Sequence, residues 1–105
     1  MGWNIQHLDH TRSYTQIANL MRHAERELTV SEFRPLAPLA EYRTDCWIEL
    51  TNAQAGQIRD ALHLLAQRLR SKRFSRDAHG WAIFARDLAQ AADTAHRTGR
   101  PWRWS

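Results

Sequence analysis

The sequence contains little cysteine and glycine, and it lacks any long apolar run. Cys46 is the single cysteine among 105 residues, so an internal disulfide framework is excluded and a reducing compartment is indicated. No stretch approaches the roughly 18 apolar residues that a membrane span requires. Residues 1–10 also lack the cationic start and apolar centre of a secretory signal. Together these absences predict a cytoplasmic protein that does not enter a membrane.

The usual signatures of catalysis and of cofactor binding are missing as well. The four glycines are well separated and form no phosphate-binding loop, and there is no G-x-S-x-G elbow or paired-carboxylate motif. Among six histidines, His7 and His10 form an H-x-x-H pair, but no second pair follows at the spacing of a zinc site. Cys46 falls on the apolar side of a predicted strand, where a free cysteine usually serves as a small core residue. We therefore expect no enzyme activity, no metal and no cofactor.

Three stretches carry the same hydrophobic pattern, with five apolar residues at offsets of 0, 3, 7, 10 and 14. This spacing places all five on one stripe of an α-helix and predicts helices over residues 11–28, 52–70 and 76–97. The stripes are Tyr14, Ile17, Met21, Ala24 and Leu28 in the first helix, Ala55, Ile58, Leu62, Leu65 and Leu69 in the second, and Trp81, Phe84, Leu88, Ala91 and Ala95 in the third. The three stretches do not match outside their stripes, so they are not an internal repeat.

Capping residues mark the ends of these helices. Thr51 and Gln54 form a capping box at the start of the central helix. The candidate caps of the other two helices are Ser13 or Thr11 for the first and Ser75 or Asp77 for the third. Gly99, followed by Pro101, is suited to end the third helix.

Residues 41–50 alternate apolar and polar side chains, which predicts a half-buried strand. A lone strand cannot satisfy its backbone hydrogen bonds, so it requires a partner. Within this chain the candidate partner is the segment Trp3–Leu8 of the N-terminal arm (residues 1–10); otherwise the partner is another copy of the chain or another protein. Pro35 and Pro38 precede the strand and predict a connection, with one helical turn at residues 31–34.

These elements predict a single domain over residues 1–105 that is mainly α. We expect a small three-helix bundle, with a short two-stranded β element if the strand pairs within the chain. The apolar content of 43% is sufficient for a modest core. The tail, residues 100–105, is too short to fold by itself.

Positive charge is concentrated toward the C-terminus. Residues 1–67 carry six arginines against eight carboxylates, whereas residues 68–105 carry nine cations against three carboxylates. Two clusters are the candidate binding sites: the basic run of Arg68, Arg70, Lys72, Arg73 and Arg76, and the tail with Arg100, Trp102, Arg103 and Trp104. Cations can contact phosphates or acidic protein surfaces, and tryptophan rings can stack on bases or dock on a partner. The alternatives are that the basic run is a solvated turn and that the tail tryptophans fold back over the bundle.

A helical scaffold that displays arginine and tryptophan without a catalytic constellation favours a binding protein. We expect a non-enzymatic regulator or inhibitor that docks on a larger, nucleic-acid-handling protein or ribonucleoprotein assembly. Small proteins of phages and other mobile elements, anti-CRISPR proteins among them, are similar in size and style, although no motif connects them to this sequence. The alternatives are a protein that binds nucleic acid directly through the basic run and the tail, and a self-associating structural subunit.

Overall fold

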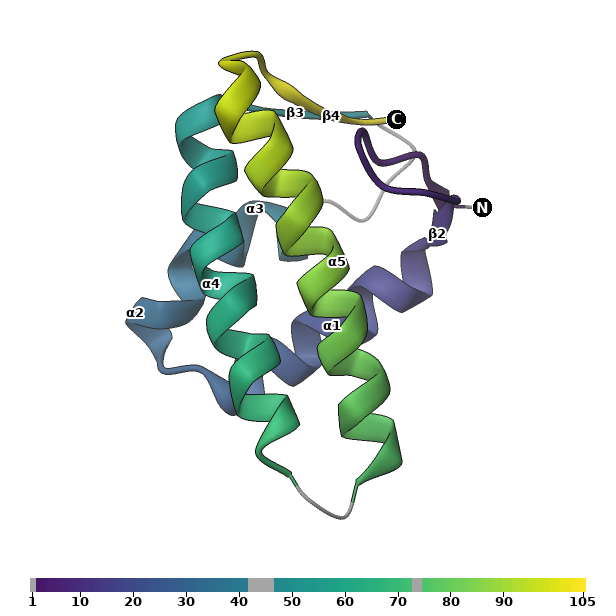
Figure 1. Ribbon diagram of the computed structural model, residues 1–105, viewed down its shortest axis with the longest axis vertical. Coiled ribbons are helices and arrows are strands. Elements are labelled where there is room, and N and C mark those ends of the chain that lie inside the picture. The colour runs from purple at the N-terminus through teal and green to yellow at the C-terminus, as the bar shows by residue number, and fades with distance from the viewer. Residues whose placement is uncertain (1, 42–46, 73–74) are drawn as a thin grey trace.

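A computed structural model describes residues 2–41, 47–72 and 75–105 (Figure 1). Its three long helices are α1 (Tyr14–Glu27), α4 (Asn52–Arg70) and α5 (Arg76–Thr98). Between α1 and the second sheet lie three short helical elements: α2 (Val30–Phe33), the 3₁₀ helix η1 (Arg34–Leu36) and α3 (Ala37–Glu41). The strands are β1 (Gly2–Trp3), β2 (Arg12–Ser13), β3 (Ile48–Leu50) and β4 (Trp102–Trp104). No helix in these ranges is long and apolar enough to cross a membrane.

The three predicted helices are confirmed, and side chains cap their N-termini as the sequence indicated. Ser13 and Gln16 form a capping box on α1, as do Thr51 and Gln54 on α4. The Ser75 side chain accepts a hydrogen bond from the Ala78 amide at the start of α5. Each cap satisfies amides that the first turn of a helix leaves without a partner.

The bundle has four helices rather than three, because the stretch predicted as a connection is itself helical. Residues 30–41 form α2, η1 and α3 in direct succession, which we count as the fourth helix. Thr29 and Glu32 provide a capping box for it. Pro35 lies at the start of η1 and Pro38 at the start of α3. A proline in a first turn interrupts no helical hydrogen bond, so neither proline prevents this short helix.

Helices α4 and α5 form an antiparallel hairpin and lie side by side along their length (Figure 1). The predicted stripe of α4 is buried throughout. On α5 the buried face consists mostly of alanines: Ala78, Ala82, Ala85, Ala89, Ala91, Ala92 and Ala95, together with Leu88. Small side chains let the two helices pack closely. Trp81 and Phe84, which the stripe assigned to the core, lie at its margin and are only partly buried.

The strand within residues 41–50 pairs with the tail, so the expected partner was wrong. β3 and β4 are antiparallel, with Ile48 opposite Trp104 and Leu50 opposite Trp102. The N-terminal arm lies on the other edge of β4, where the Gln6 amide donates to the Arg103 carbonyl at 3.0 Å. β4 therefore has backbone partners on both sides. The short tail is stabilised by this pairing with the rest of the chain. Residues 42–46 of the predicted strand, Cys46 included, lie outside the described residues.

The tryptophans of the arm and the tail form one end of the core. Trp3, Trp102 and Trp104 are at most 2% exposed. The Trp104 ring packs edge-on against Trp102 and Trp3, at centroid separations of 5.4 and 6.0 Å. Trp102 Nε1 donates to the Gln6 carbonyl at 2.9 Å. Trp104 Nε1 is buried without a hydrogen-bond partner among the described residues.

This difference between two equally buried tryptophans gives a matched test. Trp102→Phe and Trp104→Phe remove the same indole group, but only the first removes a hydrogen bond to Gln6. We expect Trp102→Phe to lower the free energy of unfolding by about 1 kcal/mol more than Trp104→Phe does. Urea titrations of both variants measure the difference. Equal losses, or a larger loss for Trp104→Phe, would contradict the assignment.

The central helix provides the second test of the core. Leu62 and Leu65 are fully buried in α4. Truncating either to alanine leaves a cavity and should reduce the free energy of unfolding by about 2–5 kcal/mol. Gln67→Ala, at an exposed position of the same helix, should change it by less than about 0.5 kcal/mol. Thermal melts of the leucine variants that match the Gln67 control would show that the stripe does not form the core.

Candidate interaction groove between α1 and α5

The basic run is partly neutralised by the fold. Arg68 donates two hydrogen bonds to the Glu32 carboxylate, at 2.6 and 2.8 Å, and a third to the Glu27 carbonyl at 2.8 Å. Lys72 Nζ lies 3.2 Å from the Glu27 carboxylate. These contacts tie the C-terminal end of α4 to α2 and to the end of α1. Arg68 and Lys72 thus stabilise the bundle, and their charges are already balanced.

The other members of the basic run are placed differently. Arg70 and Arg76 are exposed and form no ion pair with the described part of the chain. Arg73 lies outside the described residues. Among its described members, the run is therefore divided between paired and unpaired cations.

The tail does not display the two tryptophans that the sequence suggested as stacking surfaces. Trp102 and Trp104 are 0% exposed, because β4 alternates buried and exposed positions and turns both rings toward the core. Arg103, on the outward side, lies 3.6 Å from the Glu49 carboxylate of β3. Arg100 is exposed. The structure agrees with the alternative prediction, in which the tail tryptophans fold back over the bundle.

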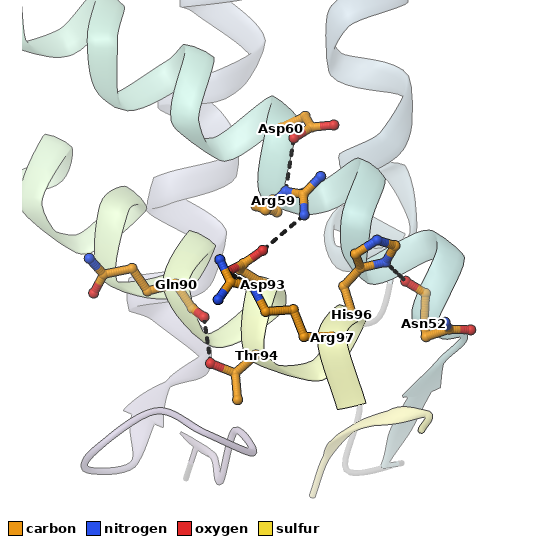
Figure 2. Close-up of polar contacts among 8 residues, drawn as sticks. All are labelled: Asn52, Arg59, Asp60, Gln90, Asp93, Thr94, His96 and Arg97. Carbon is orange, nitrogen blue, oxygen red and sulfur yellow. Dashed lines mark hydrogen bonds and ion pairs between the residues drawn. The ribbon is translucent and has the colours of Figure 1, made fainter. Parts of the chain in front are cut away.

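A polar cluster joins the N-terminal half of α4 to the C-terminal half of α5 (Figure 2). Arg59 donates to Asp93 across the two helices at 2.9 Å, and Arg97 lies 2.9 Å from the other oxygen of the same carboxylate. The hydrogen bond from Arg59 lowers the pKa of Asp93 below its usual range. Contacts with Asp60 and then Asp93 raise the pKa of Arg59. Because each charge is compensated within the cluster, its role is to hold the hairpin together.

His96 and Gly56 complete this junction. His96 Nδ1 donates to the Asn52 carbonyl at 2.7 Å, close to the start of α4 (Figure 2). The ring lies so near the α4 backbone that a Cβ on Gly56 would meet His96 Nδ1 at 2.7 Å. His7 and His10 lie in a non-helical loop with positive φ. Across residues 2–41, 47–72 and 75–105, no three His, Cys, Asp or Glu side chains are grouped as metal ligands.

A surface depression with both apolar and charged walls lies between α1 and the N-terminal half of α5. It consists of two adjoining hollows that share Asp77 and Trp81, and we call it the α1–α5 groove. The first hollow is lined by Asn19, Arg22, His23, Glu25 and Arg26, and the second by Arg12, Gln16, Arg76, Gly80, Ile83, Phe84 and Asp87. Another hollow, on the α3 side of α1, is lined by Trp3, Ile17, Met21 and Leu39 among others.

Aromatic rings form the floor of the groove. Trp81 lies between the rings of His23 and Phe84, at centroid separations of 5.0 and 6.1 Å. The Arg12 guanidinium carbon is 5.4 Å from the Phe84 ring centroid, within the range of a cation–π contact. Ile83 is 53% exposed beside these rings. The groove therefore offers an aromatic and aliphatic surface that the chain itself covers only in part.

Arginines surround this floor. Arg12, Arg22, Arg26 and Arg76 form no ion pair with any described residue, in contrast to Arg68 and Lys72. Arg12 is nevertheless held in place, because it donates to the Asp9 and His10 carbonyls at 3.1 and 3.4 Å. The unneutralised cations of the described chain are thus concentrated at this groove more than at the basic run.

The surroundings of His23 favour its neutral form. Arg26 Nη2 donates to His23 Nδ1 at 2.9 Å, which requires an unprotonated nitrogen. Burial lowers the pKa of His23, and the Arg26 charge lowers it further, against the opposing effects of Asp77 and Glu27. A neutral imidazole that packs at a tilt against Trp81 adds to the apolar character of the floor.

The sequence interpretation missed this groove because it assigned its parts to other roles. Trp81 and Phe84 were assigned to the apolar stripe of the third helix, and Arg22 and Arg26 were not among the candidate binding residues. A signal was present in α5: alanines occupy most of its buried positions, which indicates close packing against another helix and little space for large rings. Contact between α1 and α5 could not be inferred, because nothing in either helix specifies their crossing.

Comparison with known proteins gives one match. A family model described as a domain of unknown function (DUF7739) matches residues 5–105. This range includes α1, α4, α5 and β4, and so contains both walls of the groove. No curated protein matches the chain, and no solved structure does.

The Arg68–Glu32 pair predicts a pH dependence of stability. Hydrogen bonds from Arg68 and from the Thr29 amide lower the pKa of Glu32 from 4.5 to about 2. Because the folded pKa is the lower one, the stabilisation is complete above about pH 4.5 and is lost as the pH falls through about 2. Glu32→Gln should therefore be less stable at pH 7 and should lose less stability than the wild type between pH 5 and pH 2.

Urea titrations at several pH values measure this effect. Glu25→Gln is the matched control, because Glu25 is exposed on α1 and has no ion pair among the described residues. The control should follow the wild-type curve. An acid-induced decline that is equally steep in the Glu32 variant would show that the pair does not contribute.

Proposed function

We propose that this chain, which belongs to the family described as a domain of unknown function (DUF7739), is a small non-enzymatic binding protein. It acts as a regulator or inhibitor that docks on a larger, nucleic-acid-handling protein assembly. The observation that supports this proposal is the α1–α5 groove, where arginines without ion pairs surround a partly exposed aromatic floor.

The composition of the groove is that of a protein–protein hot spot. Tryptophan and arginine are among the residues most enriched where alanine substitution weakens binding. Trp81 is rigidly placed between two rings, and Arg12 is fixed by two carbonyls and by Phe84. Side chains that are already ordered lose less conformational entropy when a partner binds.

Direct binding to nucleic acid is the less favoured function on this surface. Two cations of the basic run, Arg68 and Lys72, are engaged by carboxylates. The tail tryptophans that could have stacked on bases are buried. Asp77 also lines the groove and would repel a phosphate backbone, whereas Asp87 is paired with Arg86 at 3.4 Å. A protein partner can place its charges to suit a wall of mixed sign.

The reason for predicting self-association through the strand no longer applies. That expectation rested on a strand within residues 41–50 that lacked a partner. β4 provides the partner along Ile48–Leu50. A second copy of the chain is therefore not needed to satisfy the backbone of β3.

Two triple variants with the same net charge test the proposal. The groove variant replaces Arg22, Arg26 and Arg76 with serine, and the control replaces Arg34, Arg70 and Arg100. All six side chains are exposed and without ion pairs among the described residues, and each variant lowers the net charge from +4 to +1. The wild type and both variants are tagged and used for capture from the native host, with and without nuclease.

The expected result is a protein assembly that survives nuclease treatment and is lost with the groove variant but kept by the control. If nuclease removes the assembly, or if only free nucleic acid is captured, the proposed protein docking is wrong. Loss with the control and not with the groove variant would place binding on Arg34, Arg70 or Arg100 instead. Circular dichroism of each variant verifies that it remains folded.

A further inference from the structure

Gly80 is a glycine for which the fold provides no reason. Gly99 ends α5 with a φ of 70°, a conformation that favours glycine. Gly56 makes room for the His96 ring. Gly80, by contrast, lies inside α5 without a positive φ, and a Cβ built on it would meet no atom within 4 Å. A glycine inside an exposed helix is less stable than alanine would be, so this position lacks both a conformational and a packing explanation.

The position of Gly80 points to an explanation outside the chain. It lines the second hollow of the α1–α5 groove, one helical turn from Arg76 on one side and from Phe84 on the other. Ile83 is exposed beside it, and Arg12 stands on the α1 side. The missing side chain thus leaves a gap between a cation and an aromatic ring. Glycine is favoured where another molecule must approach a backbone closely.

We propose that this gap receives a segment of a protein partner that carries one large apolar side chain flanked by carboxylates. The apolar side chain lies over Gly80 against Ile83 and Phe84, and the carboxylates bind Arg76 and Arg12. This inference rests on the proposed function, because it specifies what docks in the same groove. It goes further by giving the chemistry of the partner and the role of Gly80.

Charge distribution favours a peptide over a nucleic acid as the occupant. The groove carries four arginines, Arg12, Arg22, Arg26 and Arg76, and three carboxylates, Glu25, Asp77 and Asp87. Asp87 is paired with Arg86 at 3.4 Å, which leaves Glu25 and Asp77 without an ion pair among the described residues. A phosphodiester strand has a negative charge at every residue, so it cannot avoid these two carboxylates. A peptide can place its acidic residues opposite the arginines and uncharged residues elsewhere. The exposed aliphatic surface of Ile83 likewise matches an apolar side chain better than a sugar or a phosphate.

If a partner segment lies over Gly80, adding a side chain at this position should raise thermal stability and weaken binding. Gly80→Ala and Gly80→Leu add a helix-favouring side chain that meets nothing in the chain, so both variants should melt at a higher temperature than the wild type. The same side chains fill the gap, so both should weaken binding. Gln90→Ala, an exposed position on the same helix outside the groove, is the matched control and should leave binding unchanged.

The probe is a displayed library of random peptides of about 12 residues, selected on the full chain, followed by fluorescence titrations of individual enriched peptides. We expect enriched peptides with Asp or Glu on both sides of Leu, Ile, Phe or Trp. Their affinity should fall about fivefold with Gly80→Ala and more than about fiftyfold with Gly80→Leu. Gln90→Ala should bind within about twofold of the wild type.

Four results would overturn the inference. Enriched peptides without a preference for acidic residues would refute the partner chemistry. Affinities unchanged in Gly80→Leu would remove Gly80 from the site. An oligothymidylate of about 20 nucleotides that binds the wild type, competes with the peptides and is rejected by Gly80→Leu would make single-stranded nucleic acid the occupant. Capture of the native assembly by Gly80→Leu at wild-type levels would refute this inference while leaving the proposed protein docking intact.

Discussion

The pairing of β4 between β3 and the N-terminal arm is the interaction on which the rest of the structure depends. Residues 102–104 pair with Ile48–Leu50 on one side, and on the other side Arg103 and the following Ser105 form backbone hydrogen bonds with Gln6 and Asn4. This placement buries Trp102 and Trp104 and brings Trp3 against them. A two-stranded ribbon alone is marginal in water, so the tryptophan packing and the pairing stabilise each other. Both ends of the chain are thereby fixed to the same end of the bundle.

The second constraint is the close α4–α5 hairpin, and the groove is its consequence. Alanines along α5, the Gly56–His96 contact and the Arg59–Asp93 pair all require the two helices to lie close together. A hairpin packed through small side chains has no space between its helices for the rings of Trp81 and Phe84. These rings project toward α1 instead, where His23 and Arg12 cover them in part. An aromatic surface with arginines at its margin results from this packing.

The density of cations along the sequence did not identify the candidate site. What identified it was whether each cation already forms an ion pair within the fold. The densest run of cations in the sequence includes Arg68 and Lys72, both of which are used to fasten α4 to α2 and α1. A cation that is paired with a buried or half-buried carboxylate is poorly available to a binding partner. Removing that cation would also destabilise the fold. Arg22, Arg26 and Arg76, which are more scattered in the sequence, retain their charge at one surface.

The sequence by itself determined the local elements, because helix stripes, capping boxes and strand alternation depend on neighbouring residues. The Thr51–Gln54 box, the stripe from Ala55 to Leu69 and the end of α5 at Gly99 are of this kind. Only the tertiary structure decided what each element packs against: that β3 pairs with the tail, that Arg68 binds Glu32, and that α1 crosses α5 beside Trp81. These contacts join residues that are far apart in the chain, and many alternative partners would satisfy the same local pattern. Their choice follows from how all the apolar faces can be buried at once, which no single segment specifies.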